Sequence, residues 1–186
     1  MDRPRMRGSI WLGQLRYMQD TMGTAPLTQA LAASTATTRT ALARVLPVSW
    51  VCTEAAAEFK QHVAWRVGED CDALQRRVCC GGIEYTARGV WRPMLKFVPD
   101  RMLASRIPTL YRRAFDKGGL EVETLGTGAV LVRVLGWPDM THFDAMGIAS
   151  GLEAVLSIAG RTDVSCRFGH GSDDAHVYFE LRWRAD

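Results

Sequence analysis

The sequence predicts an α+β fold in which a helical N-terminal part packs on a four-stranded antiparallel sheet formed by the C-terminal third. Apolar residues recur at spacings of three and four over most of residues 9–118, as on the buried face of amphipathic helices. After residue 119 the pattern changes to alternation, which is typical of strands with one buried face. We therefore expect a single domain over residues 1–186, with a mainly helical subdomain at 1–118 and a hairpin, helix, hairpin subdomain at 119–186.

Capping and breaking residues divide the first part of the chain into five expected helices. Their starts are Ser9, Pro26, the threonine-rich stretch 34–40, Thr53 and the residue after Asp70. Gly23, Pro47 and Gly68 are the expected ends of the first, third and fourth. From residue 88 onward, Gly89, Pro93 and Pro99 predict a bend or loop, and Pro108 is expected to start a last short helix.

The C-terminal third reads as two hairpins joined by a helix. The runs "LEVETLG" and "AVLVRVLG" flank the turn residues 127–128, and "DVSCRF" and "HVYFELRW" flank the polar loop "GHGSDD". Between the hairpins, an amphipathic helix is expected from Pro138 to Gly160, with one apolar stripe facing the core.

Composition and length are those of an ordinary soluble globular domain, with 47% hydrophobic and 23% charged residues. No stretch approaches the roughly 18 uninterrupted apolar residues that a membrane-spanning helix needs, and the N-terminus does not resemble a signal peptide. The five cysteines, an odd number without regular spacing, indicate free thiols rather than a disulfide framework. We therefore expect a cytoplasmic protein.

Charge is distributed unevenly along the chain. Residues 76–117 carry ten Lys or Arg against three Asp or Glu, whereas residues 118–186 carry five against ten. Such a basic segment can bind nucleic acid, which we keep as the weaker alternative because no known DNA- or RNA-binding module frames it. The basic residues lie at helical spacing rather than in one dense run, so we favour the interpretation that a basic helical layer neighbours an acidic sheet within one domain.

The stretch "VCCGG" at residues 78–82 suggests redox or metal chemistry at first reading. It falls within an expected helix, however, where it presents small residues on more than one side. Small residues allow close helix approach, and a buried free cysteine behaves as a small apolar group. Vicinal thiols bridge each other only through a strained ring. We interpret this stretch as a contact point between helices.

Several longer stretches carry a resemblance to a known family. They are "RGSIWLGQLRYMQDTMG", "LPVSWVCTEAAAEF", "IPTLYRRAFDKGGLEVETLGTGAVLVRVLGWPD", "GLEAVLSIAGRTDVSCRF" and "FELRW". With them the chain resembles an uncharacterised paralogous family that is expanded in myxobacteria. In C-terminal layout that family is similar to a broader superfamily of vinyl-reductase-like sensory domains, haem-nitric-oxide-binding domains and vesicle-tethering subunits, which share a helical part packed on a four-stranded antiparallel sheet.

The resemblance raises the question of haem. The haem-binding branch needs an axial histidine on the helix preceding the hairpin and a Tyr-x-Ser-x-Arg cluster for the propionates. Between residues 76 and 120 the chain has no histidine, and "YRRAFDK" does not supply that cluster. We therefore expect no cofactor of this kind.

Other chemistry finds no better support in the sequence. Cys166, His170 and His176 do not have the spacing of a familiar zinc site, and adjacent cysteines do not suit one tetrahedral ion. No Gly-x-Ser-x-Gly turn or Gly-rich phosphate loop is present, and Asp139, Asp144, Asp173 and Asp174 read as capping, surface and loop residues. We expect neither an enzyme nor a metal site.

The resemblance also implies that ligands of this superfamily occupy the cleft between the two halves. The residues expected to line such a pocket are Trp91, Met94, Leu95, Phe97, Leu110, Tyr111 and Phe115, each of which would also suit a plain core. Our interpretation is a noncatalytic cytoplasmic sensory or protein-interaction module in signalling or regulation, with a protein partner or a second copy as homodimer through the N-terminal helices. The alternative is a binder of a hydrophobic small molecule or acyl chain in that cleft.

Overall fold

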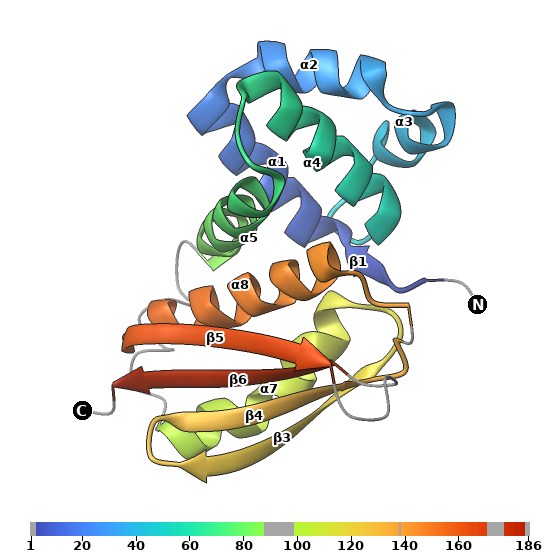
Figure 1. The fold of residues 1–186 in the computed structure, drawn as a ribbon. Helices are drawn as coiled ribbons and strands as arrows, with labels where there is room; N and C mark the ends of the chain where they lie inside the picture. The colour runs from blue at the N-terminus through green and yellow to red at the C-terminus, as the bar shows by residue number, and fades with distance from the viewer. Residues whose placement is uncertain (1–2, 88–98, 138, 171–176, 185–186) are drawn as a thin grey trace.

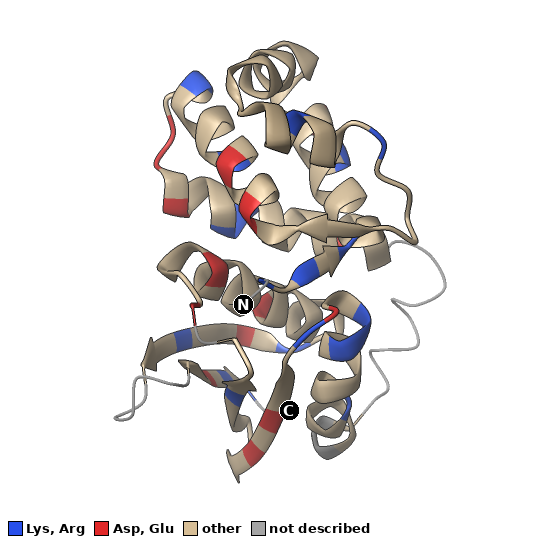
Figure 2. Cartoon of the chain, turned by 90° about the vertical axis from the view of Figure 1, so that its right-hand side faces the viewer, with Lys and Arg blue, Asp and Glu red and all other residues tan. Residues whose placement is uncertain are grey.

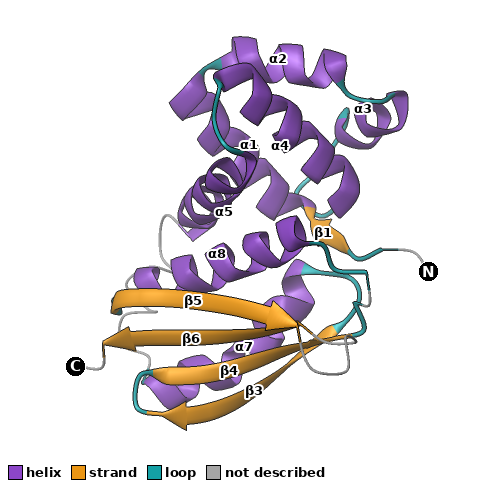
Figure 3. Cartoon of the chain, in the orientation of Figure 1, coloured by secondary structure: helices purple, strands orange, loops and turns teal. Residues whose placement is uncertain are grey.

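The computed structural model describes residues 3–87, 99–137, 139–170 and 177–184, and it has the predicted α+β architecture. A bundle of helices stands on a four-stranded antiparallel sheet, with helix α8 (His142–Ile158) between them (Figure 1). Figure 3 shows the same division by secondary structure, with the strands of the four-stranded sheet at one end of the molecule and strand β1 (Arg5–Arg7) beside the helices. Among the described helices, none is long and apolar enough to cross a membrane.

The helical half contains five helices and a small two-stranded sheet. Its elements are β1 (Arg5–Arg7), α1 (Gly8–Met22), α2 (Thr24–Ala33), α3 (Ala36–Leu42), β2 (Trp50–Cys52), α4 (Thr53–Val67) and α5 (Cys71–Ala87). Its core forms around Trp11 and Phe59, whose rings meet edge to face at 5.5 Å. Gly68 ends α4 in the left-handed conformation at φ 69°, as the sequence predicts. Strands β1 and β2 were not predicted, because three residues are too few to show alternation.

The C-terminal half contains α7 (Asp100–Ala114), β3 (Gly119–Gly126), β4 (Ala129–Leu135), α8, β5 (Thr162–His170) and β6 (Val177–Arg184). The sheet order is β3-β4-β6-β5, with all neighbours antiparallel. Register places Val132 beside Phe179 on the buried face and Arg133 beside Tyr178 on the opposite face. Both predicted hairpins are therefore confirmed, and they pair with each other through β4 and β6.

Several helix bounds differ from the prediction. Helix α1 begins at Gly8 with Arg7 as its N-cap, α2 begins at Thr24, and α3 ends at Leu42, before Pro47.

The starts of α7 and α8 differ more. Helix α7 begins at Asp100 and contains Pro108 in its interior. Leu103 and Tyr111, on either side of that proline, are both buried against the sheet core, and this packing outweighs the cost of about 3 kcal/mol for an interior proline. Helix α8 begins after Thr141, not at Pro138, because Thr141 and Asp144 form a capping box.

Helices α7 and α8 both contribute to the core on one face of the sheet. The last helix of the segment 1–118 thus packs with the C-terminal third. Helix α8 is covered twice, by the sheet and by α5, so Ala149 and Ser150 are both fully buried. The single apolar stripe expected for α8 was therefore wrong, because a helix between two layers has two buried faces.

Candidate functional site

Three aromatic rings lie where the two halves of the molecule meet. The ring centroid of Phe115 is 4.9 Å from that of Tyr111 and 5.5 Å from that of Trp137. Phe115 packs against the core of the helical half as well as that of the sheet half, and its backbone pairs with Met6 of β1. This aromatic junction, Tyr111, Phe115 and Trp137, is therefore a direct apolar contact between the two cores.

An ion pair fastens the N-terminal strand beside this junction. The Arg5 backbone N–H and guanidinium Nε donate to the Asp116 carboxylate at 2.7 and 2.6 Å, and the Asp116 N–H donates back to the Arg5 carbonyl at 3.1 Å. Burial by itself would raise the pKa of Asp116, but these hydrogen bonds from Arg5 outweigh it and lower that pKa. Strand β1 is thus held to the turn after α7 by a charged contact.

The structure brings together two of the residues expected to line a pocket. Tyr111 and Phe115 belong to the aromatic junction, whereas Leu110 is 39% exposed on α7 and lies outside it. The other expected residues, Trp91, Met94, Leu95 and Phe97, lie outside the described residues.

Sequence reasoning missed Trp137, which follows β4. Its indole N–H is buried and has no acceptor among the residues that the structure describes. A tryptophan directly after the left-handed Gly136, at the end of a predicted strand, was the available sign. An unpaired buried donor is uncommon in proteins and needs an explanation.

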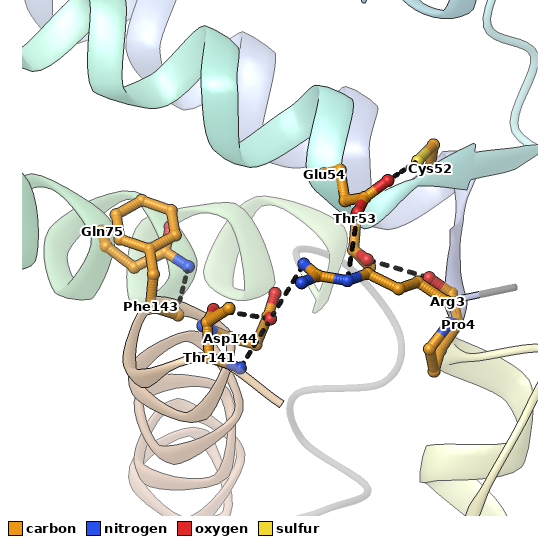
Figure 4. A network of polar contacts seen from close by, with 9 residues as sticks. All are labelled: Arg3, Pro4, Cys52, Thr53, Glu54, Gln75, Thr141, Phe143 and Asp144. Atoms are coloured by element: carbon orange, nitrogen blue, oxygen red, sulfur yellow. Dashed lines mark hydrogen bonds and ion pairs between the residues drawn. The ribbon is translucent and has the colours of Figure 1, made fainter. Parts of the chain in front are cut away.

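The second contact between the halves is the seam between α5 and α8. Along it, Gln75 Nε2 donates to the Phe143 carbonyl at 2.9 Å (Figure 4). The Cys80 thiol lies 3.3 Å from the Ser150 carbonyl, which accepts from it. Ion pairs flank these contacts, with Asp72 and His142 at 3.0 Å near one end and Arg76 and Glu153 at 2.7 Å further along. Polar groups therefore run along the whole seam.

Glycines let α5 approach both α1 and α8 closely. A Cβ atom added to Gly82 would lie 2.6 Å from Gln14 Cγ of α1, and one added to Gly81 would lie 2.3 Å from the Tyr17 ring. On α8, a Cβ atom at Gly147 would lie 2.7 Å from Gln75 Nε2. The "VCCGG" stretch thus packs α5 against α1 with its glycines and against α8 with Cys80, which is the contact role expected for it.

A cluster of buried polar side chains lies beside the seam. Lys60 of α4 is 2% exposed, and its Nζ lies 3.5 Å from Gln14 Oε1. The Gln14 amide in turn donates to Cys79 Sγ at 3.5 Å. Gln75 Oε1 is buried without a partner among the described residues. These four residues form the buried polar cluster.

The N-terminal segment contacts α4 and α8 beside the buried polar cluster. Arg3 Nε lies 3.0 Å from Glu54 Oε1 of α4, and Arg3 Nη1 lies 4.0 Å from Asp144 Oδ2 of α8 (Figure 4). Thr53 at the start of α4 donates to the Pro4 carbonyl at 2.9 Å. Arg3 therefore bridges the first turns of α4 and α8.

Three buried or half-buried cysteines, Cys79, Cys80 and Cys166, are poor nucleophiles. Burial, and next the nearby Glu153 carboxylate, raise the pKa of Cys80 to about 11 and that of Cys166 to about 12. Burial also raises the pKa of Cys79. A thiol attacks and ligates metal as the thiolate, so these groups are inert at neutral pH.

The residues present do not fit a haem held through histidine. The helix before the first hairpin is α7, which has no histidine and turns Leu103, Ile107 and Tyr111 into the sheet core. Burial raises the pKa of Tyr111, whose hydroxyl donates to the Lys117 carbonyl at 3.3 Å, so it does not offer a phenolate ligand in place of histidine.

The described histidines lie apart from each other. His62 faces Glu58 on α4, His142 starts α8, and His170 ends β5. Within the described part of the chain, no group of three or more His, Cys, Asp or Glu side chains could hold a metal ion.

The basic residues of the segment 76–117 have different environments. Arg76 pairs with Glu153 of α8, and Arg77 pairs with Glu69. Arg106, Arg112 and Arg113 are exposed on α7. Lys and Arg are present in both halves of the molecule (Figure 2). Part of the positive charge of the basic segment is thus neutralised by ion pairs with carboxylates of the same chain.

The fold is similar to that of solved H-NOX domains over nearly the whole chain. An Fe(II) unliganded H-NOX protein from K. algicida matches with a TM-score of 0.70 and 12% identity, covering 97% of this chain and 98% of that one. An H-NOX protein designated Cs matches at 0.69 and 10%, covering 97% of both chains. An oxygen-binding H-NOX domain related to soluble guanylate cyclases matches at 0.65 and 11%, covering 97% and 96%. No protein-family model and no curated protein sequence matches. The likeness establishes that this chain has the fold of H-NOX domains.

Proposed function

We propose that this chain is a noncatalytic sensory module that does not use a histidine-ligated haem. The observation that carries this proposal is the pairing of a whole-length H-NOX fold with a helix α7 that contains no histidine. Solved domains of this fold include one that binds oxygen and others studied as Fe(II) proteins. A chain that keeps the architecture without the axial ligand retains the mechanical parts of such a sensor and takes a different input.

The state of the reactive groups supports a noncatalytic role. Cys79, Cys80 and Cys166 are held as thiols by burial. The Asp144 carboxylate is occupied by the capping box of α8 and by Arg3. General acid–base catalysis needs groups that are open to substrate, whereas these groups are buried or engaged by other side chains.

The seam is the path by which a signal would pass between the halves. Helix α8 contacts α5 on one side and the sheet on the other, so a shift of the helical half moves the sheet through it. Rigid movement of packed elements is the usual way in which such changes spread. The output would be read by a protein partner.

One observation favours the alternative of a hydrophobic ligand at the aromatic junction. The buried indole N–H of Trp137 lacks an acceptor among the described residues, next to Tyr111 and Phe115. An apolar molecule with one carbonyl or carboxylate oxygen would supply that acceptor. The junction joins the two cores, so such a ligand would alter how they meet.

Further parts of the proposal come from the sequence. We assign the chain to the uncharacterised family expanded in myxobacteria, to the cytoplasm, and to a single domain over residues 1–186. Homodimerisation through the N-terminal helices is favoured by Trp65 of α4, which is 70% exposed. Nucleic-acid binding through the basic segment stays the weaker alternative.

Native mass spectrometry of freshly purified protein, expressed with added haem precursor, tests the proposal. We expect the mass of the bare chain or its dimer and no absorption band of haem. Extra mass that disappears on denaturation and is lost in Trp137→Phe, which keeps the ring and removes the N–H, would establish the hydrophobic-ligand alternative. Haem at one equivalent per chain would contradict the main proposal.

A further inference from the structure

Lys60 is a fully buried lysine, which is unusual in a folded protein. It lies in the middle of α4 and is 2% exposed, whereas lysine is almost never fully buried unless it is paired. The chain contains only three lysines, Lys60, Lys96 and Lys117, among its 23 basic residues. The other twenty are arginines, which cannot lose their proton in a protein. The buried position therefore holds one of the few cations that can become neutral.

The surroundings of Lys60 do not satisfy an ammonium group. Among the described residues, its three N–H donors face a single side-chain acceptor, Gln14 Oε1, at the long distance of 3.5 Å. The Phe143 ring, in the first turn of α8, lies under Nζ at 5.4 Å and offers a weak cation–π attraction, which does not replace hydrogen-bond acceptors. The positive end of the α8 helix dipole is also on this side, which disfavours a second positive charge there. Described carboxylates make no ion pair with Lys60.

The charged and titratable groups around Lys60 come from few elements. Cys79 of α5 and Asp144 of α8 favour the charged amine, but burial outweighs both and lowers the pKa of Lys60. The Asp144 carboxylate is itself engaged by Arg3 and by its capping box. Helix α2 has no charged residue, and the Arg39 guanidinium of α3 donates to backbone carbonyls.

We propose that Lys60 makes the packing of the two halves depend on proton concentration: packing of α8 on the helical half favours the uncharged amine, and opening of the seam to water favours the protonated amine. An unpaired ammonium buried beside the seam would cost more than the contacts around it return. This inference does not depend on which ligand or partner the module senses.

The direction of the pH effect follows from linkage. In the open state Lys60 has an ordinary lysine pKa of about 10.4, and in the packed state its pKa is lower. Between these two values each opening takes up one proton. The equilibrium constant for opening therefore rises about tenfold for each unit by which the pH falls, until the pKa of the packed state is reached.

The small number of lysines makes the protonation state directly measurable. Protein labelled with carbon-13 at lysine Cε should give three side-chain signals in NMR, of which the one absent from Lys60→Met belongs to Lys60. We expect that signal to titrate at lower pH than the other two. Titration of all three together in the folded protein would overturn the proposal.

Hydrogen exchange then tests the link to the seam. In the wild-type protein, the protection of α5 and α8 amides, corrected for the intrinsic exchange rate, should fall as the pH is lowered through the window above. Lys60→Met, which has a similar volume and no charge, should lose this pH dependence. Lys117→Met, a change at an exposed position, should keep it. The same slope in Lys60→Met and the wild type would contradict a role of Lys60.

Discussion

The two sides of α8 differ in chemistry although both are buried. Toward the sheet, Ile148 and Leu156 enter an apolar core with Phe179. Toward α5, the contacts are an amide, a thiol, glycines and ion pairs. Burial of apolar surface stabilises a protein by about 25 cal/mol per Å², so a large buried apolar side chain contributes more than the roughly 1 kcal/mol net of one hydrogen bond. Helix α8 is therefore bound more strongly to the sheet than to α5, and the seam is the boundary that can open.

The sheet side should give the largest loss of stability. Phe179 is fully buried in the middle of β6, so Phe179→Ala should reduce the free energy of unfolding by about 3–5 kcal/mol through lost burial and the cavity left behind. Arg182→Ala, on the exposed face of the same strand, should change it by less than about 0.5 kcal/mol. Urea unfolding measures both. A similar loss for the two variants would show that this face is not the core.

On the seam side, a fixed charge should be the most damaging change. Lys60→Arg places a permanent cation beside the start of α8 and should cost about 3 kcal/mol or more, whereas Lys60→Met should be neutral or stabilising. Thermal unfolding at neutral pH distinguishes the two variants. An arginine tolerated as well as methionine would mean that water or another group solvates position 60.

Overpacking where α5 meets α1 should cost less. Gly82→Leu must displace Gln14 and should destabilise the protein by roughly 1–3 kcal/mol. Gly119→Ala is the matched control, because its added Cβ atom would have no heavy atom within 4 Å. Equal unfolding midpoints for Gly82→Leu and the wild type would remove the argument for close packing of α5 on α1.

Replacing the two adjacent cysteines of α5 should have almost no effect on folding or binding. The double variant Cys79→Ala, Cys80→Ala should fold and keep any ligand or partner, because both thiols serve as small packing groups. In the native protein at pH 8, thiol-reactive reagents should modify Cys52 and Cys71 before Cys80 and Cys166, whose pKa values of about 11 and about 12 keep them protonated. Peptide mass mapping reads the order. Loss of function in a folded double variant would point to redox chemistry.

The smallest expected effect concerns the ion pair beside the aromatic junction. Since the pKa of Asp116 is lowered in the folded protein, its contact with Arg5 adds stability above the carboxyl's usual range of about 3.9 and loses it as the pH falls toward the lowered value. Asp116→Asn should flatten the acid limb of the stability profile. An unchanged limb would place the acid sensitivity elsewhere.

The sequence was a good guide where periodicity is simple. Both hairpins follow from alternation within one segment, and α4 begins at Thr53 as expected although no side chain caps it. It failed where two distant segments decide the outcome. Pro108 is tolerated only because α7 packs on the sheet, and the two buried faces of α8 exist only because α5 lies opposite. The burial of Lys60, Gln14 and Gln75 was not predicted, since no local pattern shows that polar side chains from three helices are enclosed together.

The contact between Arg5 and Asp116 also bears on how the protein is made. The two residues are 111 positions apart, so strand β1 is synthesised long before the turn that holds it exists. Helices α1 to α5 contact each other and all lie before α7 in the chain, so they can associate while the rest of the chain is still being translated. Closure of β1 on the turn must wait for α7, and contacts of such long sequence separation form slowly. The two halves are thus joined last, and a nascent chain passes through a stage in which the helical half is built but not yet attached.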